Sequence, residues 1–181
     1  SMTAIAIMQL VEKGKLDLDA ILQTYVPEYP KKPQGDITVR QLLTHTAGVP
    51  HYKGDLDSFS WKEYESLNKA MKRFQKRKLK GTPGEIYQYT TYGYVLLGLV
   101  IEKCSGMPYE AYMKKYIWDV AGMNNTSVEH RNQTVVNKSR LYKFGKKGKF
   151  KDDINSNLSM KVPGGGIQST AVDLLKFGQA V

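Results

Sequence analysis

The sequence predicts a mainly α-helical (α+β) fold with one small β-hairpin. Apolar residues recur at helical spacing in several segments, and serine, threonine or aspartate stands where these segments begin. Between residues 135 and 152, glycines flank a short polar turn that joins two alternating segments, a pattern typical of a hairpin. Because 181 residues with 41% hydrophobic content suffice for one core, we expect a single domain over residues 1–181.

The first segments predict a buried helix followed by a short one. Residues 2–13 form the first helix, and Gly14 follows as its C-terminal stop. Its apolar residues at helical spacing are Ala4, Ile5, Met8 and Val11. Asp19 can then cap a short helix that runs through Tyr25, since aspartate accepts backbone N–H groups at helix starts.

Two further helices are expected between residues 38 and 75. Thr38 is placed to cap a helix over residues 39–44. Ser60 and Glu63 have the spacing of a capping box and predict a helix from there through about Gln75. Its apolar stripe, which we expect in the core, consists of Tyr64, Leu67, Met71 and Phe74.

The most apolar segment lies in the C-terminal half. Residues 91–104 predict a helix that is buried on most sides, ends near Gly106 and restarts after Pro108. After the hairpin, Thr170 is expected to cap a final helix, with Asp173 in the capping-box position. The expected apolar face of this helix is Leu174, Leu175 and Phe177.

Composition argues against several kinds of site. No apolar run reaches the roughly 18 residues that span a bilayer, so we expect no integral membrane segment in this chain. Cys104 is the only cysteine and is expected to be buried and inert, which excludes an internal disulfide. His45, His51 and His130 lie in separate segments without the spacing of metal ligands. We therefore expect neither a metal nor a cofactor.

The net charge of +10 comes largely from two basic segments. The first contains Lys69, Lys72, Arg73, Lys76, Arg77, Lys78 and Lys80, and the second contains Lys143, Lys146, Lys147, Lys149 and Lys151. Nucleic-acid binding would need basic residues interleaved with aromatic ones in a known module, so we expect no nucleic-acid partner. A solvated helix face and a lysine-rich hairpin tip are the simpler explanation, and attraction to anionic polymers or phospholipid is the alternative.

A tyrosine in a tight turn directly before an apolar helix is the most informative local feature. It lies in the run Gly81-Thr82-Pro83-Gly84-Glu85-Ile86-Tyr87-Gln88-Tyr89-Thr90-Thr91-Tyr92-Gly93-Tyr94. Three other stretches accompany this run, namely Val11–Asp19, Gln41–Pro50 and Gly164–Leu174. In this order, the four stretches resemble the penicillin-binding and class C β-lactamase-related serine hydrolases.

The resemblance implies that the chain is the helical domain of a β-lactamase/transpeptidase-like fold, incomplete at both ends and with little of the central antiparallel sheet. The family's Ser-x-x-Lys nucleophile motif is expected immediately ahead of Ser1, and its late His-x-Gly or Lys-Thr-Gly strand after Val181. Ser1-Met2 are either native or a cloning scar. The compartment stays open, and the resemblance suggests an extracytoplasmic or organellar one. Apolar surfaces that meet the sheet in the family would be covered by self-association or left as a patch.

The resemblance also assigns roles to individual residues. Tyr89 is the expected catalytic residue, which would exchange a proton with the nucleophile, and the alternative is a half-buried tyrosine at a turn. Thr91 stands where the family most often has asparagine, and it is expected to bind substrate together with Gly165 and Gly166. A hydroxyl is shorter than an amide and offers one donor, so the substrate contacts should differ from those of a true β-lactamase. His45 invites a catalytic-triad interpretation, but a histidine that satisfies local backbone groups is expected.

We therefore expect the parent protein to be a serine hydrolase that cleaves an amide, peptide or ester bond in a small-molecule or peptide substrate through an acyl-enzyme. Arg140-Leu141-Tyr142 and the lysine-rich hairpin resemble the branch of mitochondrial β-lactamase-like proteins, which favours peptidase or esterase activity over antibiotic resistance. The 181 residues alone are not expected to turn over substrate. The alternative is a non-catalytic penicillin-binding-like module that recognises peptidoglycan-type peptides.

Overall fold

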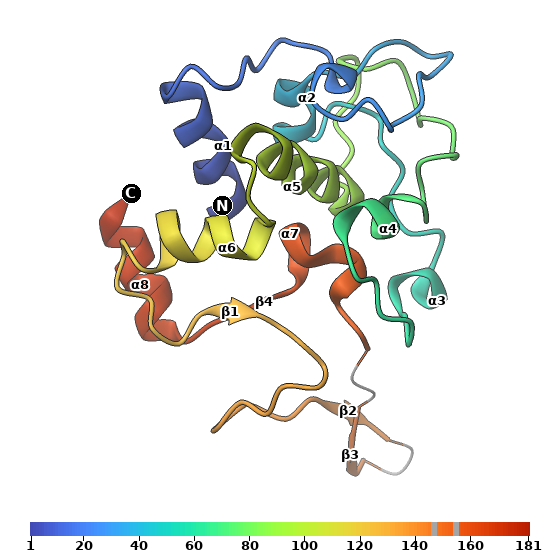
Figure 1. Cartoon of the computed structure of the whole chain (residues 1–181). Helices are drawn as coiled ribbons and strands as arrows, with labels where there is room; N and C mark the ends of the chain where they lie inside the picture. Colours follow the sequence, from blue (N-terminus) through green and yellow to red (C-terminus); the bar gives the residue numbers. More distant parts are fainter. Residues whose placement is uncertain (146–147, 154–155) are drawn as a thin grey trace.

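The computed structural model describes residues 1–145, 148–153 and 156–181, with backbone only at positions 55 and 56. Over these residues the chain forms a helical body with two small two-stranded sheets, which confirms the predicted mainly helical fold (Figure 1). Lys146 and Lys147, at the turn of the predicted hairpin, lie outside the described residues.

Helix α1 (Met2–Glu12) begins the chain and stops before Gly14, whose φ of 63° is a left-handed conformation that suits glycine. The predicted buried face of this helix is wrong. Its buried residues are Thr3, Ala6, Ile7 and Leu10, whereas Met8 is 41% exposed. Because apolar residues occur on both sides of this segment, packing against the rest of the chain decides which side is buried.

The helix predicted after Asp19 is also wrong. Asp19 binds Arg40, with Oδ1 2.7 Å from Nε, instead of capping a helix. A single 3₁₀ turn, η1 (Leu22–Thr24), lies in this segment. Helix α2 (Val39–Leu43) begins at Thr38 as predicted, where a capping box forms with the residue at its third position.

The helix predicted from Ser60 begins later than expected. The Oγ of Ser60 accepts the backbone N–H of Lys62 in a turn, and a short helix, α3 (Asp55–Ser58), precedes it. Helix α4 (Leu67–Met71) starts only at Ser66, whose Oγ accepts the N–H of its third residue. Three of the four stripe residues are buried, namely Leu67, Met71 and Phe74.

Helix α5 (Thr91–Ser105) is the centre of the fold, and α1, α2, α4, α6 and α7 surround it (Figure 1). Its residues from Thr91 to Ile101 are buried except Tyr94, which is half-buried, as the continuous apolar character of the segment predicts. Gly106 ends it with a φ of 70°, and α6 (Tyr109–Met113) and the π-helical turn η2 (Lys114–Trp118) follow.

The predicted hairpin is present. Strands β2 (Tyr142–Phe144) and β3 (Phe150–Asp152) pair antiparallel and project from the helical body (Figure 1). A second antiparallel pair joins β1 (Ser127–Val128) to β4 (Ile167–Gln168). Between β3 and β4, the chain forms the 3₁₀ turn η3 (Ser159–Lys161) and the short helix α7 (Val162–Gly165).

The final helix, α8 (Ala171–Ala180), begins at Thr170 as predicted. Of its predicted apolar face, Phe177 packs against the core, and the prediction is wrong for the two leucines. Leu174 and Leu175 are 52% and 62% exposed, and Asp173 is the buried residue of the helix. The Asp173 carboxylate accepts the N–H of Asn125 at 2.7 Å and the hydroxyl of Thr126 at 2.9 Å. A polar anchor therefore attaches α8 to the body and leaves its leucines at the surface.

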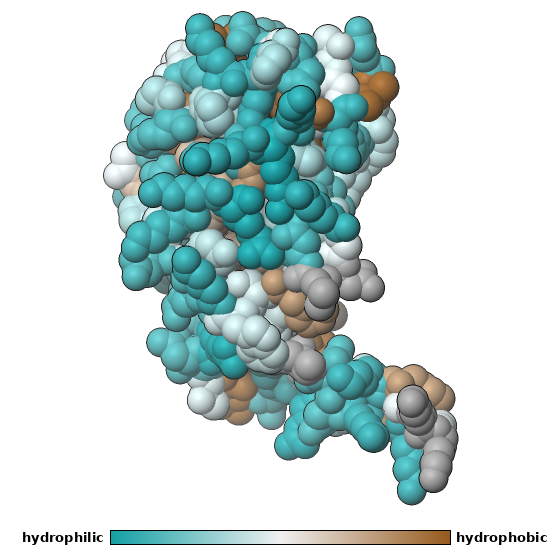
Figure 2. Space-filling model, turned by 90° about the vertical axis from the view of Figure 1, so that its right-hand side faces the viewer, coloured by the Kyte–Doolittle hydropathy of each residue, from teal (hydrophilic) through white to brown (hydrophobic). Residues whose placement is uncertain are grey.

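The side of the molecule that carries α3 and α4 is strongly hydrophilic (Figure 2). Its exposed cations include Lys69, Lys72, Lys76, Lys78 and Lys80. The two arginines of the same segment are half-buried instead, because Arg73 and Arg77 both bind the Asp57 carboxylate, at 3.0 Å and 2.9 Å. The basic segment is thus a solvated face with a half-buried ion-pair cluster beneath it. Within the described parts of the chain, no helix has the length and apolarity required to span a bilayer.

Helices α5 and α7 approach closely because Gly98 has no side chain. A Cβ at Gly98 would lie 2.4 Å from Cγ of Pro163 and 2.8 Å from Cδ1 of Leu67. On its other side, Pro163 is tied to α1, since its carbonyl accepts the Thr3 hydroxyl at 2.8 Å. The leading end of α1 and the middle of α5 therefore both meet Pro163, which directly precedes the glycine turn of residues 164–166.

Candidate active site

Tyr89 lies at the surface in the turn that leads into α5. Its side chain is 52% exposed, although the helix that follows is buried. Thr90 is the N-cap residue, yet its hydroxyl donates to the carbonyl of Pro50 at 3.2 Å and caps no helical N–H group. The first N–H groups of α5 therefore need other acceptors.

Two histidines supply these acceptors. The Nδ1 atom of His45 accepts the N–H of Thr90 at 3.2 Å, and Nδ1 of His51 accepts the N–H of Thr91 at 3.3 Å. His45 therefore satisfies local backbone groups, as expected, and it lies beyond the end of α2 in a left-handed conformation with a φ of 58°. No spacing in the sequence indicated His51.

The same two imidazoles flank Tyr89. The ring centroid of Tyr89 lies 4.6 Å from that of His45 and 5.6 Å from that of His51. Tyr94 stacks on His45 at 5.2 Å, and Tyr52 lies against His51 at 4.2 Å. The phenol is thus held in an aromatic cluster while its side chain reaches solvent.

A lysine that sequence reasoning missed adds positive charge at the edge of this cluster. The Nζ of Lys161 lies 5.4 Å from the ring centroid of Tyr52. Burial lowers the pKa of Lys161. Burial, followed by the Lys161 charge, lowers the pKa of His51, and burial followed by the His51 charge lowers that of His45. Both directions favour neutral imidazoles, which agrees with Nδ1 atoms that accept hydrogen bonds.

The other predicted site residues lie in the first turn of α5 and in the glycine turn that packs against it. Thr91 is only 7% exposed, and its Cγ2 lies 2.8 Å from where a Cβ of Gly164 would be. Gly165 is exposed, with only the Lys161 side chain near its Cβ direction. Gly166 is buried, and a Cβ there would lie 2.8 Å from Cα of Val162. The structure thus packs the glycine turn directly against the first turn of α5.

The leading end of α1 reaches the same region through a buried hydrogen-bond chain. The Thr3 hydroxyl donates to the Pro163 carbonyl and lies 2.7 Å from the Tyr109 hydroxyl. Pro163 directly precedes the Gly164 that packs on Thr91. Thr3, near the start of α1, is therefore connected through Pro163 and Gly164 to Thr91, two residues after Tyr89.

The spacing Ser-x-x-Lys also occurs once inside the chain. It is Ser66-Leu67-Asn68-Lys69. The Oγ of Ser66 accepts the backbone N–H of Lys69 at 3.2 Å, and the Lys69 ammonium pairs with Glu65. Ser66 is thus a helix cap, and the lysine is engaged by a carboxylate on the surface.

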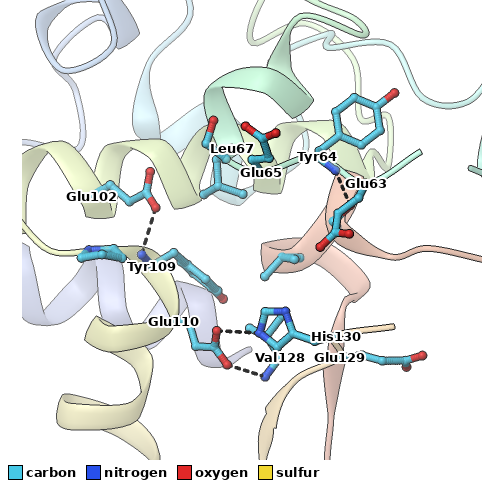
Figure 3. A pocket seen from close by; sticks show the side chains of 14 residues that line it. Glu63, Tyr64, Glu65, Leu67, Glu102, Tyr109, Glu110, Val128, Glu129 and His130 are labelled. Carbon is cyan, nitrogen blue, oxygen red and sulfur yellow. Dashed lines mark hydrogen bonds and ion pairs between the residues drawn. The ribbon is translucent and has the colours of Figure 1, made fainter. Parts of the chain in front are cut away.

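Ser66 also borders a separate cavity of about 210 Å³ between α4, α6 and β1 (Figure 3). Acidic side chains surround it. Glu110 binds His130 at 2.9 Å and accepts the N–H of Val128, and Glu102 accepts the N–H of Tyr109 (Figure 3). None of the four predicted site residues lines this cavity. Among the described residues, no group of three or more His, Cys, Asp or Glu side chains is placed to hold a metal ion.

The family model described as Beta-lactamase matches residues 1–181. The chain belongs to the beta-lactamase family. The human serine beta-lactamase-like protein LACTB, mitochondrial (Homo sapiens), is 28% identical over 249 aligned residues, which cover 100% of this chain and 45% of LACTB. The chain thus spans less than half of this relative's length.

Solved structures agree with the family assignment. A penicillin-binding protein from Bacillus halodurans superposes with a TM-score of 0.78 at 32% identity, covering 99% of this chain and 55% of that one. A D-amino acid amidase from Ochrobactrum anthropi superposes with a TM-score of 0.83 at 26% identity, covering 99% and 51%. The resemblance read from the four sequence stretches and the helical part of the fold are therefore confirmed.

Proposed function

We propose that the protein to which these residues belong is a serine hydrolase that cleaves an amide, peptide or ester bond through an acyl-enzyme. The observation that carries this proposal is the surface-exposed Tyr89 phenol, held between His45 and His51 at the start of a buried helix. In acyl transfer by a serine hydrolase, a nucleophile loses a proton and attacks a carbonyl carbon, and the leaving atom then gains a proton. A tyrosine at the start of a rigid helix can perform both transfers, the first as the phenolate and the second as the phenol that results.

In this mechanism Tyr89 reacts as the phenolate, whose oxygen accepts the proton of a serine hydroxyl as the serine oxygen attacks the substrate carbonyl. Tyr89 then donates the proton to the leaving nitrogen or oxygen, and water later releases the acyl group by the reverse sequence. We propose that the serine lies outside residues 1–181, ahead of α1. Support comes from the buried contacts that join the start of α1 to the glycine turn and from the cap geometry of Ser66. Residues 1–181 would then be one beta-lactamase-related domain, completed by further chain.

The glycine turn would form the wall along which the substrate lies. Gly165 is exposed and leaves its backbone open to a ligand, and Gly166 keeps the turn tight because a side chain there would meet Val162. Thr91 would orient the substrate through this turn, since its side chain packs on Gly164 and is nearly buried. Similarity to a D-amino acid amidase favours an amide or peptide of small size as the substrate class.

Trapping the acyl-enzyme of the intact protein tests this function. After incubation with a p-nitrophenyl ester or a chromogenic cephalosporin, we expect mass spectrometry to show an adduct on a serine outside residues 1–181. Ser66→Ala serves as the matched control, and it should form the adduct at the unchanged rate. An adduct on Ser66, or turnover by residues 1–181 alone, would contradict the proposed nucleophile. Saturable binding of a peptidoglycan-type peptide with no adduct would instead establish the non-catalytic alternative.

A further inference from the structure

His45 accepts hydrogen bonds from the backbone on both sides of Tyr89. Its carbonyl oxygen accepts the N–H of Gln88 at 2.7 Å, and its Nδ1 atom accepts the N–H of Thr90 at 3.2 Å. One residue therefore binds the backbone N–H groups of both sequence neighbours of Tyr89. Hydrogen bonds to both neighbours restrict the backbone of Tyr89 far more than the ring contact alone could.

His45 makes these two hydrogen bonds from an unusual backbone conformation. The φ of 58° at His45 is left-handed, where most residues with a side chain are strained and asparagine, aspartate and histidine are tolerated best. The ring is fixed in turn by Tyr94, stacked at 5.2 Å, and by the edge of Tyr87 at 6.1 Å. The left-handed backbone and the ring stacking thus occur at a residue whose carbonyl oxygen and Nδ1 atom both bind the segment that carries Tyr89.

His51 repeats the contact one residue further along the chain, where its Nδ1 atom accepts the N–H of Thr91. We refer to the two imidazoles with these hydrogen bonds as the histidine clamp. Both acceptors are nitrogen lone pairs, and an imidazolium has none, because both of its ring nitrogens carry protons. A protonated ring would therefore confront a backbone N–H group with another N–H group, and the clamp would open.

We propose that His45, supported by His51, is a positioning residue that aligns the Tyr89 phenol and that does so only as the neutral imidazole. The clamp makes the site acid-sensitive, with Tyr89 released when the imidazoles take up protons. This inference rests on the proposed function of Tyr89 and adds the group that holds it in place. His45 itself touches no reacting atom and is not a catalytic residue.

The groups around the clamp favour its neutral form. His45 faces the rings of Tyr87, Tyr89 and Tyr94, and burial followed by the charge of His51 lowers the pKa of His45. His51 faces Tyr52, Tyr89, Lys161 and Asp57, and the carbonyl of His51 accepts from Arg77. Lys161 disfavours protonation of His51, whereas Asp57, which is bound by two arginines, favours it. The clamp should therefore stay closed at and somewhat below the ordinary histidine pKa of about 6.5.

Substitutions at His45 in the intact hydrolase test the clamp by activity. His45→Ala removes the Nδ1 acceptor, and we expect kcat to fall by about 100-fold, the typical effect of a misplacement near 1 Å, with KM changed by less than about threefold. His45→Asn is the conservative variant, because its Oδ1 occupies the place of Nδ1 and asparagine tolerates positive φ. This variant should recover most of kcat and lose the His45 contribution to the acid limb of the pH profile. His130→Gln, a histidine bound to Glu110 elsewhere, is the matched control and should leave both unchanged.

A second measurement tests the clamp without catalysis, so that failure of the proposed function and failure of the clamp can be told apart. In ¹⁵N NMR spectra, we expect the ring of His45 to be the Nε2–H tautomer at pH 7 and the amide of Thr90 to shift with its titration. In His45→Asn this amide shift should vanish while His51 and Thr91 still titrate together. A protonated Nδ1 at pH 7, or a kcat of folded His45→Ala within threefold of wild type in an active enzyme, would overturn the clamp.

Discussion

The close contact between α5 and α7 can be tested by adding one methyl group at Gly98. In Gly98→Ala, the new Cβ would lie 2.4 Å from Cγ of Pro163, 2.8 Å from Cδ1 of Leu67 and 3.1 Å from Cβ of Pro163. The proline ring cannot turn away, and both neighbours are buried. The helices must therefore separate or the glycine turn must move.

The size of the effect follows from two opposing contributions. Alanine stabilises a helix interior over glycine by up to about 1 kcal/mol. Overpacking a filled core costs about 1–3 kcal/mol, and two contacts below 3.0 Å place this site at the upper end. The free energy of unfolding should therefore fall by about 2 kcal/mol. For a chain of this size, that corresponds to a Tm lower by about 4–8 °C.

Thermal and denaturant unfolding monitored by circular dichroism measure this change, with Gly178→Ala as the control. Gly178 also lies in a helix, α8, but nothing is within 4 Å of its Cβ position. That substitution should leave the Tm unchanged or raise it by about 1–3 °C. Equal stabilisation by both substitutions would refute the close approach of α5 to the glycine turn.

Three further predictions concern stability and assembly. Burial alone would raise the pKa of Asp57, but hydrogen bonds and charges from Arg77 and Arg73 hold this pKa below its ordinary value. The carboxylate therefore stabilises the fold above about pH 4 and ceases to do so as the pH falls further. Asp57→Asn should lower the free energy of unfolding by about 1–3 kcal/mol at pH 7 and by much less at pH 3, and an equal loss at both pH values would contradict this linkage. Tyr109→Phe removes the buried contact to Thr3 and should cost about 1 kcal/mol in urea unfolding, and no change in midpoint would argue against that contact. Because Leu174 and Leu175 are exposed on α8, residues 1–181 should self-associate in sedimentation experiments, and Leu175→Glu should reduce this; a wild-type chain that stays monomeric at all concentrations would speak against it.

Local signals predicted the elements whose packing agrees with their pattern. The run from Thr91 to Ile101 is apolar on every side, and it is the buried central helix. Thr38 and Thr170 cap helices as predicted, since each side chain accepts the backbone N–H of the third residue of its helix. Tyr89 could be singled out because a Pro-Gly turn directly precedes an apolar helix.

The remaining features depend on contacts between distant segments. Ser60 has a capping-box pattern, but its hydroxyl is used in a local turn, so α4 starts at Ser66. Leu174 and Leu175 resemble a core face, yet the buried carboxylate of Asp173 decides how α8 docks. His51 carries no signal in the sequence, because its role arises only where α5 begins 40 residues later.

The same holds for the electrostatics of the site. Lys161 is one of 27 Lys and Arg residues, and its importance comes from its place beside Tyr52 and His51. The partnership of His45 with the amides around Tyr89 joins residues that are more than 40 positions apart. Spacing within one segment cannot reveal such a partnership.

The role of Tyr89 is tested most directly by steady-state kinetics of the intact protein with Tyr89→Phe, compared with Tyr87→Phe. Both substitutions remove one exposed hydroxyl from the same turn, since Tyr87 is 71% and Tyr89 52% exposed. If Tyr89 carries the proton, its loss should lower kcat for ester or amide hydrolysis by about 10²–10⁴-fold, and Tyr87→Phe should stay within about twofold of wild type. A Tyr89→Phe protein that hydrolyses its substrate as fast as the Tyr87→Phe protein would contradict this account.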